Sequence, residues 1–207
     1  MSFKRPHQPE KTNTMAAVNS TMLELGTQAP DFRLTDVTTG EVITPETAKG
    51  KTGLAVLFIC NHCPYVKLLK HELVAYATYA QSMGVGVVAI NANDVENYPD
   101  DSPDKMKEDA EQFSYPFPYL FDETQETAKA YMAACTPDIF LFDANLKLFY
   151  RGQFDGARPG NGIEPTGEDL RNATDLLAQG ENAPAEQIPS IGCNIKWKQG
   201  NEPEYFG

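Results

Sequence analysis

No stretch of the sequence approaches the roughly 18 consecutive apolar residues that a membrane-spanning helix needs. Basic residues are also scarce: 17 Lys and Arg stand against 29 Asp and Glu, which leaves a formal net charge of −12. Nucleic acids and anionic membranes both reward a positively charged surface. We therefore expect neither nucleic acid nor membrane among the partners of this protein.

Cysteine is rare, and the four residues in the chain are far too few for a secreted scaffold held together by disulfides. The polar N-terminal segment contains no apolar core of the kind that a secretory signal requires. We therefore expect a cytoplasmic protein, in which paired cysteines are more often catalytic or metal-binding than structural. Residues 1–22 are expected to be a flexible extension, with Met1 or Met15 as the native start.

Residues 23–207 are expected to fold as a single α/β domain. Residues 54–59 and 85–90 are continuous apolar runs, typical of strands covered on both faces. Residues 64–83 between them carry an apolar stripe at spacings of three and four, so the three segments form a βαβ unit with parallel strands. Further elements are expected as follows: hairpins at 35–44 and 139–150, a strand at 119–121, and helices at 103–113, 122–133 and 166–180. This order predicts helices flanking a central mixed sheet, with a C-terminal tail.

A cysteine pair, Cys60-Asn61-His62-Cys63, lies between the first apolar run and its helix. Residues three apart on a helix share a face, so the two sulfurs can meet. We expect Cys60 at the helix N-terminus, where the dipole and the unpaired backbone N–H groups favour a thiolate. Cys60 would attack a substrate disulfide, and Cys63 would then attack Cys60 and release the reduced substrate. His62 would stabilise the Cys60 thiolate further.

Other uses of the pair have to be weighed against redox chemistry. A Cys-x-x-Cys is half of a zinc site, but neither Cys135 nor Cys193 has a second Cys or His three residues away. Buried, inert thiols are a second alternative, because free Cys is often buried. A third is a metal-binding or metal-delivery protein that uses Cys60, His62 and Cys63, since such a set can hold copper.

The positions of these residues resemble the thioredoxin superfamily. There, a Cys-x-x-Cys at the end of a buried strand faces a cis Thr-Pro peptide, which corresponds here to Thr136-Pro137 before a hairpin. The resemblance implies a thioredoxin-like three-layer sandwich. LGTQAPDFRLTDVTTGEV, at 25–42, is similar to the opening of the redoxin branch, which includes peroxiredoxins and the alkyl hydroperoxide reductase–thiol-specific antioxidant family. NHCPYVK, INANDVENYPDDSP and PSIGCNIKWKQGNEPEYF look like a peroxiredoxin-like group within that branch.

The sequence departs from both patterns. Counted back from Cys60, the Thr and Pro positions of the peroxiredoxin motif Pro-x-x-x-Thr/Ser-x-x-Cys hold Leu57 and Gly53, and the count from Cys63 fails as well. The peroxide-activating Arg of that family has no match before the late strand. The buried acid of thioredoxin, six residues before the first Cys, corresponds to Leu54, so another base or water has to accept the proton of the second Cys.

We therefore expect a thiol–disulfide oxidoreductase, with a thiol-dependent peroxidase and a metal-delivery protein as alternatives. The dithiol carries the electrons, so no organic cofactor is expected. Thr136-Pro137 would shape a groove for an extended partner. The partners would be protein dithiols or disulfides and an electron donor of the thioredoxin or glutathione type.

Two other thiols and one acidic loop are secondary candidates. Cys135 directly precedes Thr136, which would bring it near Cys60 as a third redox thiol, and Cys193 in the tail would serve as a resolving thiol. Both can instead be packing residues. The acidic loop, whose spacing does not fit an EF-hand, is expected to be solvated; it contains Asp94, Glu96, Asp100 and Asp101. Trp197 is expected to pack onto the core with the tail.

Replacing His62 with Gly is expected to make the reduction potential of the Cys60–Cys63 pair more negative. The reason is that thiolate stabilisation favours the reduced form and so makes the disulfide the better oxidant. A redox titration in glutathione buffers measures the potential. An unchanged potential would remove His62 from this role.

Overall fold

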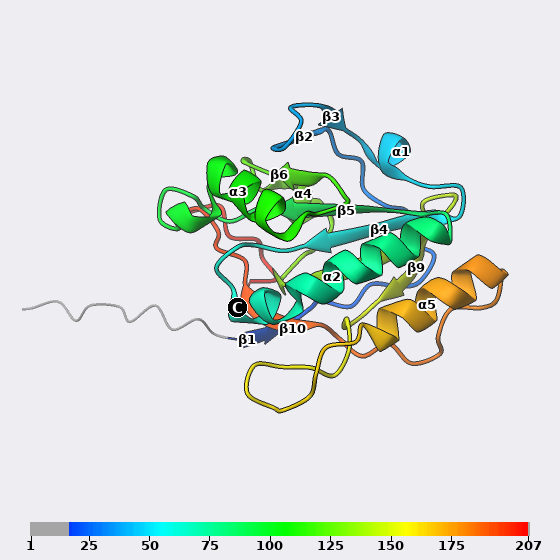
Figure 1. Ribbon diagram of the computed structural model, residues 1–207. Coiled ribbons are helices and arrows are strands. Elements are labelled where there is room, and N and C mark those ends of the chain that lie inside the picture. Colours follow the sequence, from blue (N-terminus) through cyan, green and yellow to red (C-terminus); the bar gives the residue numbers. More distant parts are fainter. Residues whose placement is uncertain (1–16, 207) are drawn as a thin grey trace, which may run out of the picture.

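The computed structural model describes residues 17–206 (Figure 1). Most of the expected flexible extension, residues 1–22, lies outside this range. Within it, however, Ala17–Asn19 form strand β1, so the folded domain extends further toward the N-terminus than the sequence predicts. The reason is non-local, because β1 pairs with a strand near the other end of the chain. No helix in residues 17–206 is long and apolar enough to cross a membrane.

The main sheet is mixed and has seven strands. β4 pairs in parallel with β5, and β5 with β6, whereas β8 runs antiparallel to β4. Its strands, in spatial order, are β3 (Val42–Ile43), β2 (Leu34–Asp36), β6 (Tyr119–Phe121), β5 (Val85–Asn91), β4 (Gly53–Phe58), β8 (Asp138–Asp143) and β9 (Leu148–Arg151). A second, three-stranded sheet has β10 (Ile191–Asn194) between β1 and β7 (Cys135–Thr136).

Helices pack on the main sheet, with α2 and α5 side by side in Figure 1. α2 is the connection between the parallel strands β4 and β5, as a βαβ unit requires. The helical segments are α1 (Pro45–Ala48), α2 (Pro64–Ser82), the 3₁₀ turn η1 (Pro99–Asp101), α3 (Pro103–Phe113), α4 (Glu126–Ala130) and α5 (Glu168–Gln179). This is the three-layer arrangement that the sequence predicts.

Alternation along β4 divides its side chains between two cores. Ala55 and Leu57 pack with the buried faces of α2, α3 and α5. Leu54, Val56 and Phe58 point to the other side, where α4 and the segment after β10 cover them. Burial on both faces explains why this strand is a continuous apolar run. The polar residues Asn61 and His62 follow this strand and therefore lie at the edge of the sheet where β4 ends.

Three sequence-based boundaries are wrong. The helix predicted at 122–133 is only α4, because Gln125 takes a left-handed backbone conformation with φ of 65° just before it. The last helix is capped by Gly167, also left-handed, rather than by Thr166. The weakly patterned tail contains β10, and Trp197 in that tail packs into the core as expected.

A buried ion pair fixes the loop between β7 and β8. Asp138 follows Pro137, and its carboxylate accepts from the backbone N–H of Ala134 at 3.0 Å and from Arg151 at 3.2 Å. Both charged side chains are fully buried. Burial raises the pKa of Asp138 to about 6, although Arg151 opposes that shift. Arg151 also donates to two backbone carbonyls of the loop before β7 and lies over the ring of Phe140.

Replacing Arg151 with Leu is expected to destabilise the protein by about 3–5 kcal/mol, because it leaves the Asp138 carboxylate buried without its partner. Urea unfolding measures the loss. Lys105→Ala, which removes an exposed ion pair with Glu108, is the control and should leave stability nearly unchanged. Equal effects of the two substitutions would contradict this role of Arg151.

Candidate functional site

The cysteine pair lies where β4 ends and α2 begins. The first residue of α2 is Pro64. Proline is tolerated at the first helical position, and it disfavours helical backbone in the residue before it. Cys63 is therefore the N-cap, with φ of −62° and ψ of 125°, and Cys60 precedes the helix. The expectation that Cys60 occupies the helix N-terminus is wrong, because that place belongs to Cys63.

The two thiols nevertheless meet, because both contact Thr136. The Cys60 sulfur lies 3.4 Å from the Thr136 hydroxyl, and the protonated Cys63 thiol donates to the Thr136 backbone oxygen at 3.1 Å. The two thiols are close enough for each to shift the pKa of the other. The Thr136–Pro137 peptide is cis, as the resemblance implies. Cys60 is 1% exposed and Cys63 is 0% exposed, so a partner reaches them only after a local opening.

A third thiol approaches Cys63 from β10. In the antiparallel pair β10–β7, Cys193 lies directly opposite Thr136, so the two side chains share one face of the small sheet. Cys193 is close enough to Cys63 to lower the pKa of the Cys63 thiol, and both belong to one buried cluster. Cys63 thus stands between Cys60 and Cys193, and we refer to these three residues as the three-thiol cluster.

Cys135 lies apart from this cluster. It is the neighbour of Thr136 on β7, and strand alternation directs its side chain to the other face. Its thiol donates to the backbone oxygen of Pro137 at 3.3 Å. Burial, followed by repulsion from Asp138, raises the pKa of this thiol. A redox role for Cys135 stays a prediction to which this geometry adds no support.

The surroundings of the three-thiol cluster favour a thiolate at Cys63. Hydrogen bonds from Cys193 and then from Cys60 lower the pKa of Cys63, and the backbone N–H of Val66 in the first turn of α2 adds to the effect. The pKa of Cys60 is raised, first by burial, then by the contact with Cys63 and by the charge of Asp101. These directions favour a thiolate at Cys63, whereas the sequence analysis assigns the thiolate to Cys60.

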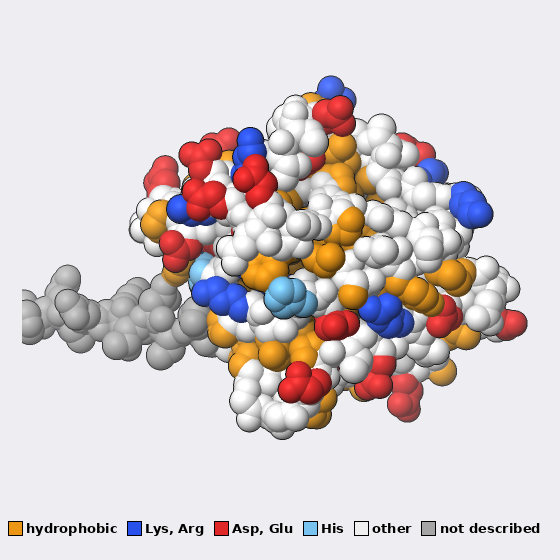
Figure 2. All heavy atoms as spheres, in the orientation of Figure 1, with side chains coloured by type: hydrophobic (Ala, Val, Ile, Leu, Met, Phe, Trp, Pro, Cys, Tyr) orange, Lys and Arg blue, Asp and Glu red, His pale blue; other side chains and the backbone are white. Residues whose placement is uncertain are grey.

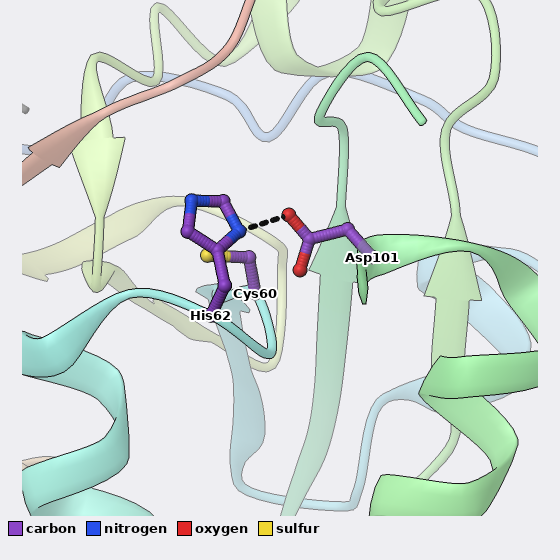
Figure 3. Close-up of side chains that lie close together, drawn as sticks. All are labelled: Cys60, His62 and Asp101. Carbon is purple, nitrogen blue, oxygen red and sulfur yellow. Dashed lines mark hydrogen bonds and ion pairs between the residues drawn. The ribbon is translucent and has the colours of Figure 1, made fainter. Parts of the chain in front are cut away.

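A buried carboxylate, Asp101, faces Cys60 across the site (Figure 3). One carboxylate oxygen lies 2.6 Å from His62 Nδ1 and 2.8 Å from the side-chain amide of Asn93. The other accepts from the backbone N–H of Asn61 at 2.8 Å. The Cys60 sulfur, a ring nitrogen of His62 and a carboxylate oxygen of Asp101 all lie within 4.8 Å of one another.

The pairing with Asp101 fixes the imidazole of His62. Because the carboxylate accepts, Nδ1 carries the ring proton. Nε2 is then the ring atom with a free lone pair; it is buried and has no hydrogen-bond partner among residues 17–206. The ring also stacks on Tyr98, with centroids 5.5 Å apart. The pairing with Asp101 thus holds the ring in place and leaves Nε2 as its proton-accepting atom.

The expectation that the whole acidic loop is solvated is wrong for two of its residues. Glu96 and Asp100 are exposed, but Asp94 and Asp101 are buried. Asp101 is the residue whose place beside the cysteine pair the sequence analysis missed. The order of the parallel strands could have indicated its position, because polar residues that follow neighbouring parallel strands gather at the same edge of the sheet. Asn93, just after β5, is one of these residues and bonds to it.

Two hollows flank the site. A groove of about 210 Å³ borders His62 and is lined by Lys67 and Lys105 together with acidic residues of α3. Figure 2 shows acidic side chains gathered over that helix. On the other side, a narrow pocket lies between Pro137 and Arg158, a residue to which the sequence assigns no chemistry.

Comparisons with known proteins identify a family and similar solved structures. The model of the AhpC/TSA family matches residues 25–151. An uncharacterized conserved protein from Geobacillus kaustophilus is 56% identical, with 89% of this chain and 97% of that chain covered and a TM-score of 0.87. A hypothetical protein from Sinorhizobium meliloti is 46% identical, with 88% and 99% covered and a TM-score of 0.85. A search of the curated proteins found no match.

A more distant likeness defines the fold. The thioredoxin domain of a thiol-disulfide oxidoreductase from Bacteroides vulgatus has a TM-score of 0.59 at 16% identity, with 76% of this chain and 99% of that chain covered. The protein therefore has a thioredoxin-like fold of the redoxin kind. The chain belongs to the AhpC/TSA family.

Reduced protein is expected to keep one thiolate as the pH falls below about 8.5, the pKa of an ordinary thiol. The reason is that the pKa of Cys63 is lowered, so its ionised form persists on the acid side of that value. Ultraviolet absorbance of the thiolate, followed during an acid titration, measures this. Cys63→Ser should remove the signal and Cys135→Ser should leave it. A signal that survives Cys63→Ser would contradict the assignment.

Proposed function

We propose that the protein is a thiol–disulfide oxidoreductase that cycles Cys60 and Cys63 between dithiol and disulfide. The observation that carries the proposal is that both thiols contact the same residue, Thr136, one at its hydroxyl and the other at its backbone oxygen. Membership of the AhpC/TSA family supports redox chemistry at this site. The partner class is a protein or small-molecule disulfide, and the electron donor is of the thioredoxin or glutathione type.

The first step uses the thiolate of Cys63. It attacks one sulfur of a substrate disulfide, the substrate S–S bond breaks, and one substrate thiolate leaves. Cys63 is then joined to the substrate in a mixed disulfide. We assign the attack to Cys63 rather than Cys60 because the hydrogen-bond donors converge on Cys63, whereas the charge of Asp101 opposes a thiolate at Cys60.

The second step uses Cys60 and the His62–Asp101 pair. His62 accepts the proton of the Cys60 thiol, and the resulting thiolate attacks the sulfur of Cys63. The mixed disulfide breaks, the second substrate sulfur leaves and takes the proton from His62, and the Cys60–Cys63 disulfide forms. One substrate disulfide has become two thiols at the expense of two protein thiols. The His62–Asp101 pair thus takes the place of the buried acid of thioredoxin, whose position in this chain is occupied by Leu54.

Peroxide reduction has less support. A peroxidase needs a cationic donor beside the attacking sulfur. Arg151, which is fully buried, is already bonded to Asp138 and to backbone carbonyls. It cannot turn toward a peroxide without leaving Asp138 unpaired in the core. We therefore treat peroxidase activity as secondary to disulfide exchange.

Metal delivery also has less support. The ligand set would be Cys60 and His62 with Asp101, rather than with Cys63. Asp101 already accepts three hydrogen bonds, from His62, Asn61 and Asn93. Binding a cation there would break these contacts, so the carboxylate is better suited to orient His62 than to coordinate a metal.

A redox titration in glutathione buffers, with alkylation and mass spectrometry at every cysteine, tests the proposed function. A Cys60–Cys63 disulfide is expected to form reversibly between about −120 and −270 mV, the range of known dithiol oxidoreductases. Cys63→Ser should abolish this disulfide, and Cys135→Ser should leave its potential unchanged. If no disulfide involving Cys63 forms at any potential, the protein is not a thiol–disulfide oxidoreductase.

A further inference from the structure

Cys63 has two thiol neighbours, and the proposed reaction uses only one of them. Cys60, just after β4, shares the contact with Thr136, and Cys193 on β10 lies opposite Thr136 in the strand pairing. All three sulfurs belong to one buried cluster with α2. In a mixed disulfide between Cys63 and a substrate, two different thiols of the chain are therefore in reach of the Cys63 sulfur.

The position of Cys193 is fixed by close packing of two backbones. β10 pairs with β7 so that Cys193 lies opposite Thr136. Its neighbour Gly192 has no side chain, and a Cβ there would lie only 2.0 Å from the backbone oxygen of Thr136. Glycine is therefore required for this approach. The pairing holds Cys193 on the same face as Thr136, which is the face toward Cys63.

We propose that Cys193 is a second resolving thiol and that the protein holds its disulfide in two interchangeable positions, Cys60–Cys63 and Cys63–Cys193. The inference rests on the proposed function and assigns the catalytic cycle a third cysteine. Its basis is the central place of Cys63 in the three-thiol cluster and the backbone packing that fixes Cys193.

The exchange between the two positions needs no external oxidant. The Cys193 thiol loses its proton, and its sulfur attacks the sulfur of Cys63 in the Cys60–Cys63 disulfide. That bond breaks, the Cys63–Cys193 bond forms, and Cys60 leaves as a thiolate that takes up the proton. One disulfide and one thiol are present before and after the step. The product joins β10 to the start of α2 and frees Cys60 beside His62.

Cys135 provides the internal comparison. It is as buried as Cys193 and lies on the neighbouring strand, but its thiol bonds to the backbone oxygen of Pro137 rather than to a thiol. If burial and nearness in sequence to Thr136 were enough, Cys135 would exchange as readily as Cys193. The geometry points to Cys193 alone.

The test uses the Cys60→Ser variant of the full chain, oxidised in glutathione buffer, quenched in acid, alkylated and mapped by mass spectrometry. We expect the Cys63–Cys193 disulfide to exceed the adduct of Cys63 with glutathione by at least about tenfold, because an oriented neighbouring thiol outcompetes one in solution. Adding Cys135→Ser should not change this ratio. Adding Cys193→Ser should leave only the glutathione adduct.

Two results would overturn the inference. One is a Cys60→Ser variant that carries glutathione on Cys63 while Cys193 stays reduced. The other is a Cys63–Cys135 disulfide in that variant. Cys60→Ala serves if the serine variant does not fold. The unmodified protein is titrated in parallel: if it forms Cys60–Cys63 while the variant forms no Cys63–Cys193, the oxidoreductase function stands and only the role of Cys193 fails.

Discussion

Thr136 is the residue on which three separate parts of the chain converge. Its hydroxyl contacts Cys60, its backbone oxygen contacts Cys63, and its strand partner is Cys193. The loop that presents it is held from behind by Asp138 and Arg151, which are buried together. Asp138 of the fully buried ion pair thus lies only two residues from Thr136, the residue that both thiols of the proposed redox pair contact.

The electrostatics of the site do not rely on positive charge. In a chain with a net charge of −12, the groups that lower the pKa of Cys63 are two neighbouring thiols and the N–H of Val66 at the start of α2. The buried carboxylate of Asp101 works against a thiolate at Cys60. In the proposed mechanism, these opposite environments separate the attacking sulfur from the resolving one. The same carboxylate bonds to His62, which the mechanism uses as the acceptor of the Cys60 proton.

Local sequence patterns were enough for the elements that carry the site but not for its long-range contacts. The apolar run of β4 and the stripe of α2 each have a signature within a few residues, and the role of Thr136-Pro137 came from the family resemblance. The N-cap role of Cys63 was also readable, because Pro64 starts the helix. Asp101 and Cys193 were named in the sequence analysis, but their positions beside the cysteine pair were not readable from it. One reaches the cysteines through a bonded loop after β5, and the other through pairing of short strands distant in sequence. Such contacts leave no periodicity in the chain.

The identity of the attacking sulfur tests this mechanism most directly. Reduced protein mixed rapidly with glutathione disulfide and quenched in acid after a short interval would retain the first mixed disulfide, which mass spectrometry can locate. The mechanism predicts glutathione on Cys63 at the earliest times, followed by its loss as the intramolecular disulfide forms. Glutathione found first on Cys60 would contradict the mechanism, because it would mean that the donors around Cys63 do not select the attacking sulfur.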